Sequence, residues 1–167
     1  MNDSPEVLAL RQLLVMCSGQ VEALEEALQD MEQRGFTAPG LDNLNKADRR
    51  LLDQFAYRYT RLQDDMGARL MPAILRALGE DVAVMSALDR FNRMEQLGWL
   101  PSADEWVTLR RIRSEFAHDY PDSSEERLER LLAAMTAARQ LISIMAQINQ
   151  KIRQRFPGKT DFPEHHR

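Results

Sequence analysis

The sequence has little of what a disulfide scaffold or a cysteine-based metal site needs. Cys17 is the only cysteine, so no intrachain disulfide can form and no metal site can be built from several cysteines. Glycine and proline number only seven each, which permits long helices, and turn-forming residues gather mainly in 35–45 and 119–124. The 167 residues suit a single domain, and 44% of them are hydrophobic, enough for one continuous core.

The sequence also has no excess of positive charge. The formal net charge is -4, so no global basic field attracts nucleic acid, and any RNA contact must rest on a local basic patch. The basic residues are 19 arginines and three lysines. Arginine presents a planar fork that suits phosphate, although a GC-rich coding sequence gives the same bias.

Targeting signals are missing as well. The N-terminus lacks a basic stretch followed by an apolar core, which argues against a signal peptide. No apolar run approaches the length expected of a membrane span. We therefore expect a soluble, cytoplasmic protein that makes no use of a membrane.

Apolar residues recur at helical spacing along most of the chain. Ser4 suits the N-cap of a helix that starts at Pro5, and a heptad seam then continues to a helix end near Gly35. Residues 37–42 are expected to form a loop around Pro39. A second helix is expected to begin at Asn45 and to be kinked or interrupted at Pro72, which has no N–H.

Three further helices are predicted after the second. One spans 82–97. The next begins at a capping box headed by Ser102 and runs to about His118, and the last begins at a second capping box headed by Ser123. No strand pattern and no internal repeat occur in the sequence.

The expected fold is therefore all-α, an antiparallel bundle of four to five helices over 1–156, with a flexible C-terminal tail over 157–167. Two of the three histidines, His165 and His166, lie in the tail, where such a pair is usually incidental. His118 is the only histidine within the expected domain.

The residues around His118 are suited to phosphate chemistry. Residues 110–120 read Arg-Arg-Ile-Arg-Ser-Glu-Phe-Ala-His-Asp-Tyr. On a helix, Arg113 falls at the edge of the buried stripe and Arg110 lies beyond it on the same side. A charge beside an apolar face needs a partner, which for Arg113 is either a phosphate or a carboxylate such as Asp53, Asp64 or Glu115.

Arg113 and His118 diverge on a straight helix. Five positions separate them, so their side chains point roughly 140° apart and cannot act on one atom. Two arrangements would bring them together: fraying of the helix before Pro121, or a second chain that supplies one of them. Arg110 and Arg111 either extend a phosphate-binding patch or form a solvated face.

The eight residues from Arg113 to Tyr120 resemble the signature of HEPN domains, an Arg followed after four to six residues by a His, late in a helical bundle. They are most similar to the HepT toxin branch, whose pattern is Arg-Asn-x-x-x-His-x-Tyr. Arg113, His118 and Tyr120 match this pattern, whereas Ser114 stands where the branch usually has Asn.

This resemblance implies a HEPN-like fold and a metal-independent ribonuclease toxin of a toxin-antitoxin system. Such an enzyme needs no cofactor, acts on RNA as a homodimer and is restrained by a cognate nucleotidyltransferase antitoxin. His118 would be the general base or acid in attack by the ribose 2′-OH, and Arg113 would stabilise the phosphate charge. Tyr120 corresponds to the tyrosine that the partner modifies by AMP transfer.

Other interpretations stay open on the sequence alone. A related protein could assist a nucleotidyltransferase without cleaving RNA, and Ser114 favours this slightly. A structural adaptor could use the heptad seam of the first helix for assembly. For the motif itself, His118 could simply favour the helix dipole, with Arg113 paired to a carboxylate.

Overall fold

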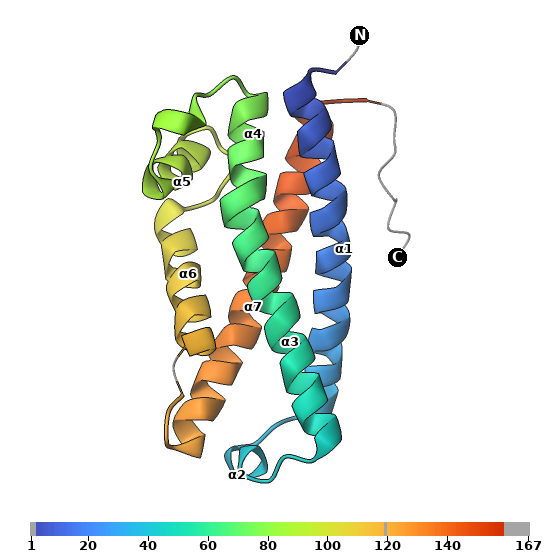
Figure 1. The fold of residues 1–167 in the computed structure, drawn as a ribbon, viewed down its shortest axis with the longest axis vertical. Coiled ribbons are helices and arrows are strands. Elements are labelled where there is room, and N and C mark those ends of the chain that lie inside the picture. Colours follow the sequence, from blue (N-terminus) through green and yellow to red (C-terminus); the bar gives the residue numbers. More distant parts are fainter. Residues whose placement is uncertain (1–2, 119, 159–167) are drawn as a thin grey trace.

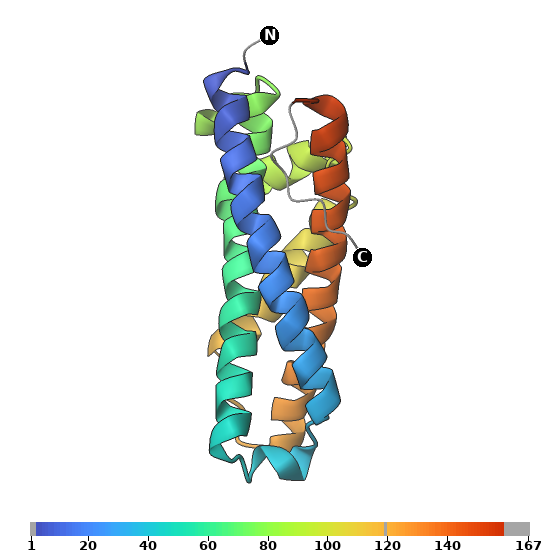
Figure 2. The ribbon, with the colours of Figure 1, turned by 90° about the vertical axis from the view of Figure 1, so that its right-hand side faces the viewer.

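The computed structural model describes residues 3–118 and 120–158. Within these residues the protein is all-helical, with no strand, which confirms the predicted all-α class. The long helical segments lie side by side and run alternately up and down, so both ends of the described chain lie at the same end of the bundle (Figures 1 and 2).

The helices do not all have the predicted bounds. The longer ones are α1 (Pro5–Arg34), α3 (Lys46–Asp65), α6 (Ala103–His118) and α7 (Ser124–Arg155). The shorter ones are α2 (Ala38–Leu41), the π-helical η1 (Met66–Leu70), α4 (Met71–Ala77), the 3-10 helix η2 (Val82–Val84) and α5 (Ala87–Gln96).

Side-chain caps fix where the long helices begin. The Ser4 hydroxyl accepts a hydrogen bond from the Val7 N–H, and the Asn45 side chain accepts one from the Asp48 N–H. At its C-terminal end α1 closes on Gly35, whose φ of 60° is left-handed and favours glycine. These starts and this stop agree with the sequence prediction.

Pro72 does not break the second helix. α3, η1 and α4 follow one another without a gap, and the π-helical turn of η1 comes directly before the proline. In that turn the Met71 N–H bonds to the Met66 carbonyl. Since Pro72 cannot donate a hydrogen bond, the wider turn accommodates it without ending the helix.

Two local predictions were wrong. The single helix predicted over 82–97 is instead η2 followed by α5, with Met85 extended between them. Ser86 starts α5 through a full capping box, in which Asp89 returns a hydrogen bond to the Ser86 N–H. The predicted loop around Pro39 contains the one-turn helix α2.

The buried apolar side chains form one connected core along the bundle. Its largest fully buried members include Trp106, Tyr59 and Phe55. The heptad seam of α1 is buried against α3, α4 and α7 of the same chain. The seam therefore serves the core of this chain, which removes the feature on which the adaptor interpretation depended.

The expectation that no apolar run approaches a membrane span was wrong by length and composition. Both α1 and α7 contain a stretch long and apolar enough to cross a membrane. Half of the α7 stretch is buried inside the bundle. A core helix meets the same criterion, so these stretches give only weak support for a membrane location.

Candidate functional site

Most of the predicted site residues lie on α6. Its buried stripe, with Trp106 and Leu109, holds the helix against the bundle, and α6 continues without a break to His118. Fraying before His118 is therefore not observed. Arg113 and His118 stay on one helix and point roughly 140° apart, so they do not meet within one chain.

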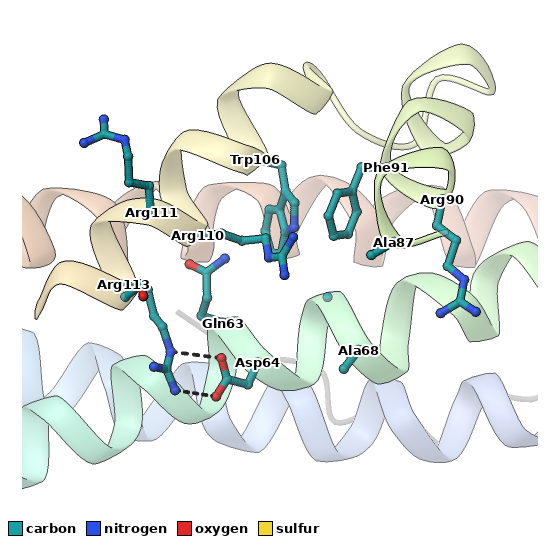
Figure 3. Close-up of a pocket in the computed structure, with 12 residues that line it drawn as sticks. Gln63, Asp64, Ala68, Ala87, Arg90, Phe91, Trp106, Arg110, Arg111 and Arg113 are labelled. Atoms are coloured by element: carbon teal, nitrogen blue, oxygen red, sulfur yellow. Dashed lines mark hydrogen bonds and ion pairs between the residues drawn. The ribbon is translucent and has the colours of Figure 1, made fainter. Parts of the chain in front are cut away.

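Arg113 has a carboxylate partner. Its Nε lies 3.0 Å from Oδ1 of Asp64 on α3, and its Nη2 lies 2.6 Å from Oδ2 (Figure 3). The Arg113 side chain is 22% exposed. This is the two-pronged geometry that arginine forms with carboxylates, and it confirms one of the predicted pairings. Two of its five N–H groups are used, so three remain for another anion.

His118 and Tyr120 are both accessible. His118 is exposed at the last turn of α6, and the Tyr120 side chain is 88% exposed. Two residues before His118, Phe116 packs edge-on against Phe55 and Tyr59, which anchors this end of α6 to α3. His118 is thus held on a fixed helix end but faces solvent.

The cationic residues of α6 line a cleft of about 580 Å³ between α3–η1, α5 and α6 (Figure 3). Four arginines line it, with Asp64 as the sole carboxylate among its described residues. Its lining includes Gln63, Arg90, Phe91, Trp106, Arg110 and Arg113. The cleft is therefore a local basic patch on a molecule whose net charge is -4.

The predicted residues are not all brought together. Arg110, Arg111 and Arg113 line this cleft. Tyr120 lines a different groove of about 580 Å³, together with Tyr57 of α3. His118 lines neither of these two hollows.

Gln63 and Trp106 are site residues that the sequence prediction missed. Gln63 is 2% exposed, yet neither atom of its amide has a hydrogen-bond partner in the described part of the chain, and the same holds for the indole N–H of Trp106. Buried polar atoms are rarely left this way. The signal was present, because Gln63 stands on the apolar stripe of α3, four residues after Tyr59.

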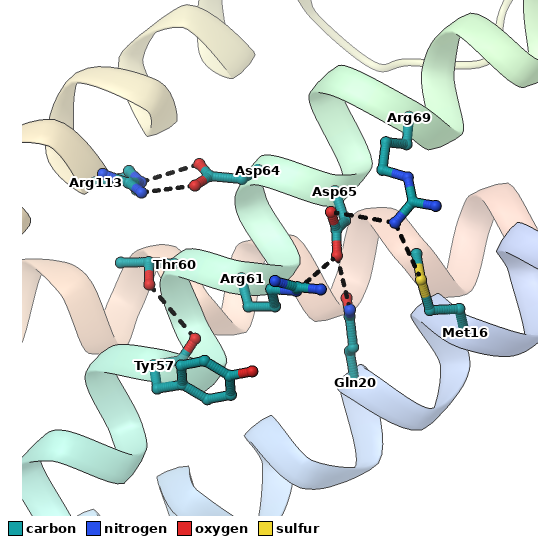
Figure 4. Close-up of polar contacts among 9 residues, drawn as sticks. All are labelled: Met16, Gln20, Tyr57, Thr60, Arg61, Asp64, Asp65, Arg69 and Arg113. Carbon is teal, nitrogen blue, oxygen red and sulfur yellow. Dashed lines mark hydrogen bonds and ion pairs between the residues drawn. The ribbon is translucent and has the colours of Figure 1, made fainter.

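Asp65, the residue after Asp64 on α3, pairs with arginines and with an amide of α1. Asp65 accepts a hydrogen bond from Nε2 of Gln20 at 2.8 Å and lies 3.2 Å from Nε of Arg61 (Figure 4). Across residues 3–118 and 120–158, no three His, Cys, Asp or Glu side chains gather as a metal ion requires. The predicted histidine pair at 165 and 166 lies outside the described residues.

Two buried groups, the Cys17 thiol and the Tyr59 hydroxyl, stay protonated at neutral pH. Burial raises the pKa of the Cys17 thiol to about 12, with a further increase from Asp65. Burial also raises the pKa of the Tyr59 hydroxyl, partly offset by the nearby Arg113. Neither group is ionised near pH 7, so neither is a candidate nucleophile.

Comparisons with protein-family models, curated proteins and solved structures find no match to this chain. The HEPN resemblance therefore rests on the eight residues from Arg113 to Tyr120.

Proposed function

We propose that this protein is a HEPN-like ribonuclease of the HepT type, which cleaves RNA at a site completed by a second copy of the chain. The observation that carries the proposal is the arrangement on α6. Asp64 holds Arg113 at the edge of a basic cleft, and the same helix ends in an exposed His118.

The chemistry follows from the groups present. His118 of one chain takes the proton of a ribose 2′-OH, and that oxygen attacks the adjacent phosphorus. The bond to the 5′-oxygen breaks, and the leaving oxygen receives a proton from solvent water, while the protonated His118 returns its proton to the solvent. The products are a 2′,3′-cyclic phosphate and a 5′-hydroxyl. Arg113 stabilises the charge that builds up on the phosphate.

The geometry of α6 supports a dimer in this proposal. An unbroken helix keeps Arg113 and His118 of one chain apart, so the pair that acts on one phosphate comes from two chains. A two-fold axis between the two chains brings each His118 next to the partner's Arg113, so that the proposed dimer has two equivalent sites. The exposure of His118 leaves it accessible for this.

Arg110 and Arg111 supply further phosphate contacts in this proposal. The Arg110 guanidinium lies over the ring of Phe91, with Cζ 5.1 Å from the ring centroid. Arg111 forms an exposed ion pair with Glu115 at 3.0 Å. Exposed pairs of this kind contribute little, so a phosphate competes for Arg111 at small cost.

Tyr120 is the proposed point of regulation. Its side chain is 88% exposed, so a nucleotidyltransferase antitoxin has access to the hydroxyl. AMP transfer would add bulk and negative charge two residues from His118 and repel RNA. We expect co-expression with the cognate partner in the cytoplasm to add AMP to Tyr120. Mass spectrometry that finds the tyrosine unmodified would remove this part of the proposal.

A second candidate function is binding without cleavage. Arg113 is already neutralised by Asp64, and Ser114 lines the cleft where the HepT branch usually has Asn. Both observations fit a protein that assists a nucleotidyltransferase and leaves RNA intact.

RNA cleavage in the presence of a metal chelator separates the two candidates. We expect wild-type protein to cut single-stranded RNA, to leave cyclic-phosphate ends, and to spare the same sequence made of DNA. His118→Ala should lower the rate about 10²- to 10⁴-fold, because it removes the proton-transfer group. Thr108→Ala, an exposed change on the same helix, is the control and should leave the rate unchanged.

Cleavage that survives His118→Ala would reject the catalytic role of the histidine. A wild-type protein that binds RNA and never cuts it would favour the second candidate.

A further inference from the structure

The cleft between α3–η1, α5 and α6 contains polar groups that RNA cleavage by His118 does not use. The Gln63 side chain points from α3 toward Arg110 and Trp106 of α6 (Figure 3). Its amide offers two donors and one acceptor oxygen, and the Trp106 indole offers one donor. None of these atoms has a partner among the described residues. Unpaired buried polar groups cost stability, which is understandable if a ligand pairs with them.

The wall of the cleft is closely fitted. A Cβ on Gly67 of η1 would lie 3.3 Å from the Trp106 ring, so glycine at this position lets the indole approach the π-helical turn. Phe91 of α5 packs against the same indole, with ring centroids 6.1 Å apart. The volume of about 580 Å³ lies within the range of roughly 300–1,000 Å³ typical of small-ligand sites.

Two of the cleft arginines are free of carboxylates in the described part of the chain. Arg113 is paired with Asp64 and Arg111 with Glu115. Arg90 donates from Nη2 to the Val82 carbonyl at 3.0 Å, which orients it without neutralising its charge. Arg110 lies over Phe91 and is exposed, so its guanidinium can turn toward a bound phosphate. Both guanidinium groups can therefore accept a phosphate as a partner.

We propose that this cleft binds a single nucleotide, with its phosphate on Arg90 and Arg110 and its base on the Gln63 amide and the Trp106 indole N–H. Glutamine fits a base because its amide presents a donor and an acceptor side by side, as base edges do. This assignment rests on the proposed function in one respect: the nucleotide is taken to belong to an RNA strand that the protein binds and cleaves. A free mononucleotide has the same chemistry.

Binding is best measured on the full chain carrying His118→Ala, so that no RNA is cut during the titration. A fluorescent RNA hexamer is titrated by anisotropy, with the four nucleoside monophosphates and inorganic phosphate as competitors. We expect Gln63→Leu and Arg90→Ala each to weaken RNA binding about tenfold or more, because each removes a buried or charged hydrogen bond. Arg76→Ala, an exposed arginine on α4 outside the cleft, is the charge-matched control and should bind like the parent.

Gln63→Met provides a second variant of nearly equal length without the amide, should the leucine variant fail to fold. Competition by mononucleotides supports a free nucleotide as occupant, and its absence supports a nucleotide within the strand. Unchanged binding by both Gln63 variants would overturn the proposal. So would equal losses in Arg76→Ala, or inorganic phosphate that competes as well as the nucleotides.

The two proposals fail in different ways. If Gln63-dependent binding is found but the wild type never cleaves RNA, the ribonuclease proposal fails and the nucleotide site stands. If His118-dependent cleavage is found but Gln63→Leu and Gln63→Met bind like the parent, the nucleotide site fails and the ribonuclease stands.

Discussion

Gln63 is an unusual buried residue in this helical bundle. Its side chain is 2% exposed and both polar atoms of its amide are unpaired within residues 3–118 and 120–158. An unsatisfied buried polar group costs about 1–3 kcal/mol. Buried polar groups without partners are common at positions that serve binding, where stability is given up for function.

We predict that Gln63→Leu stabilises the free protein by about 1 kcal/mol, because an apolar side chain of similar size removes the unpaired groups. For a chain of this length that corresponds to a rise in Tm of about 2–4 °C. Thermal unfolding by circular dichroism checks it. Gln54→Leu, an exposed position on α3, is the control, and equal shifts in the two variants would show that burial is not the cause.

Residue patterns predicted part of the site. The position of Arg113 beside the apolar stripe required an anionic partner, and Asp64 was among the three carboxylates proposed. Arg90 and Gln63 could not be placed together from the sequence. They lie 27 positions apart, and only the packing of α5 against α4 and α6 brings them to one cleft.

At the scale of elements, the end of α1 is tied to the start of α3 by one ion pair. Arg34 donates from Nε to Oδ1 of Asp48 at 2.6 Å and from Nη2 to Oδ2 at 2.9 Å. Asp48 is 4% exposed. Hydrogen bonding from Arg34 holds the pKa of the Asp48 carboxyl below its usual range, and burial only partly offsets this.

The Arg34–Asp48 ion pair makes the stability of the protein depend on pH. The folded-state pKa of Asp48 is lowered, so its contribution is full above the ordinary aspartate pKa of about 3.9 and is lost as pH falls through the lowered value. We predict that Asp48→Asn destabilises the protein at pH 7 and that its deficit relative to wild type shrinks below about pH 4. Urea unfolding at pH 7, 5 and 3 measures both. An equal deficit at all three pH values would contradict the assignment, and Asp30→Asn, an exposed change on α1, is the control.

Element boundaries were predictable where a cap marks them. Ser4, Asn45 and Gly35 fixed the ends of helices by local hydrogen bonds and dihedral angles. The π-helical turn directly before Pro72 was not predicted, because single-residue rules do not include such turns. The capping box at Ser86 was missed because Asp89 occupies the third position of the helix, where the usual capping-box pattern has Glu or Gln.

At the scale of the whole molecule, the all-α class followed from helical periodicity and the shortage of strand signals. The arrangement of helices around the cleft did not, because bundle order depends on contacts between distant segments. Two arrangements could bring Arg113 and His118 together: fraying of the helix before Pro121, or a second chain. Since α6 stays helical to His118, fraying does not bring the two side chains together, and the proposed site needs a second chain.

The most direct test of a site shared between two chains is to mix Arg113→Ala with His118→Ala. Each variant alone should be inactive on RNA. If subunits exchange freely, half of the dimers are mixed, and each mixed dimer has one site with both an intact Arg113 and an intact His118. We predict recovery of up to about a quarter of the wild-type cleavage rate after mixing. A mixture that stays as inactive as its components, although subunit exchange is verified, would contradict the account.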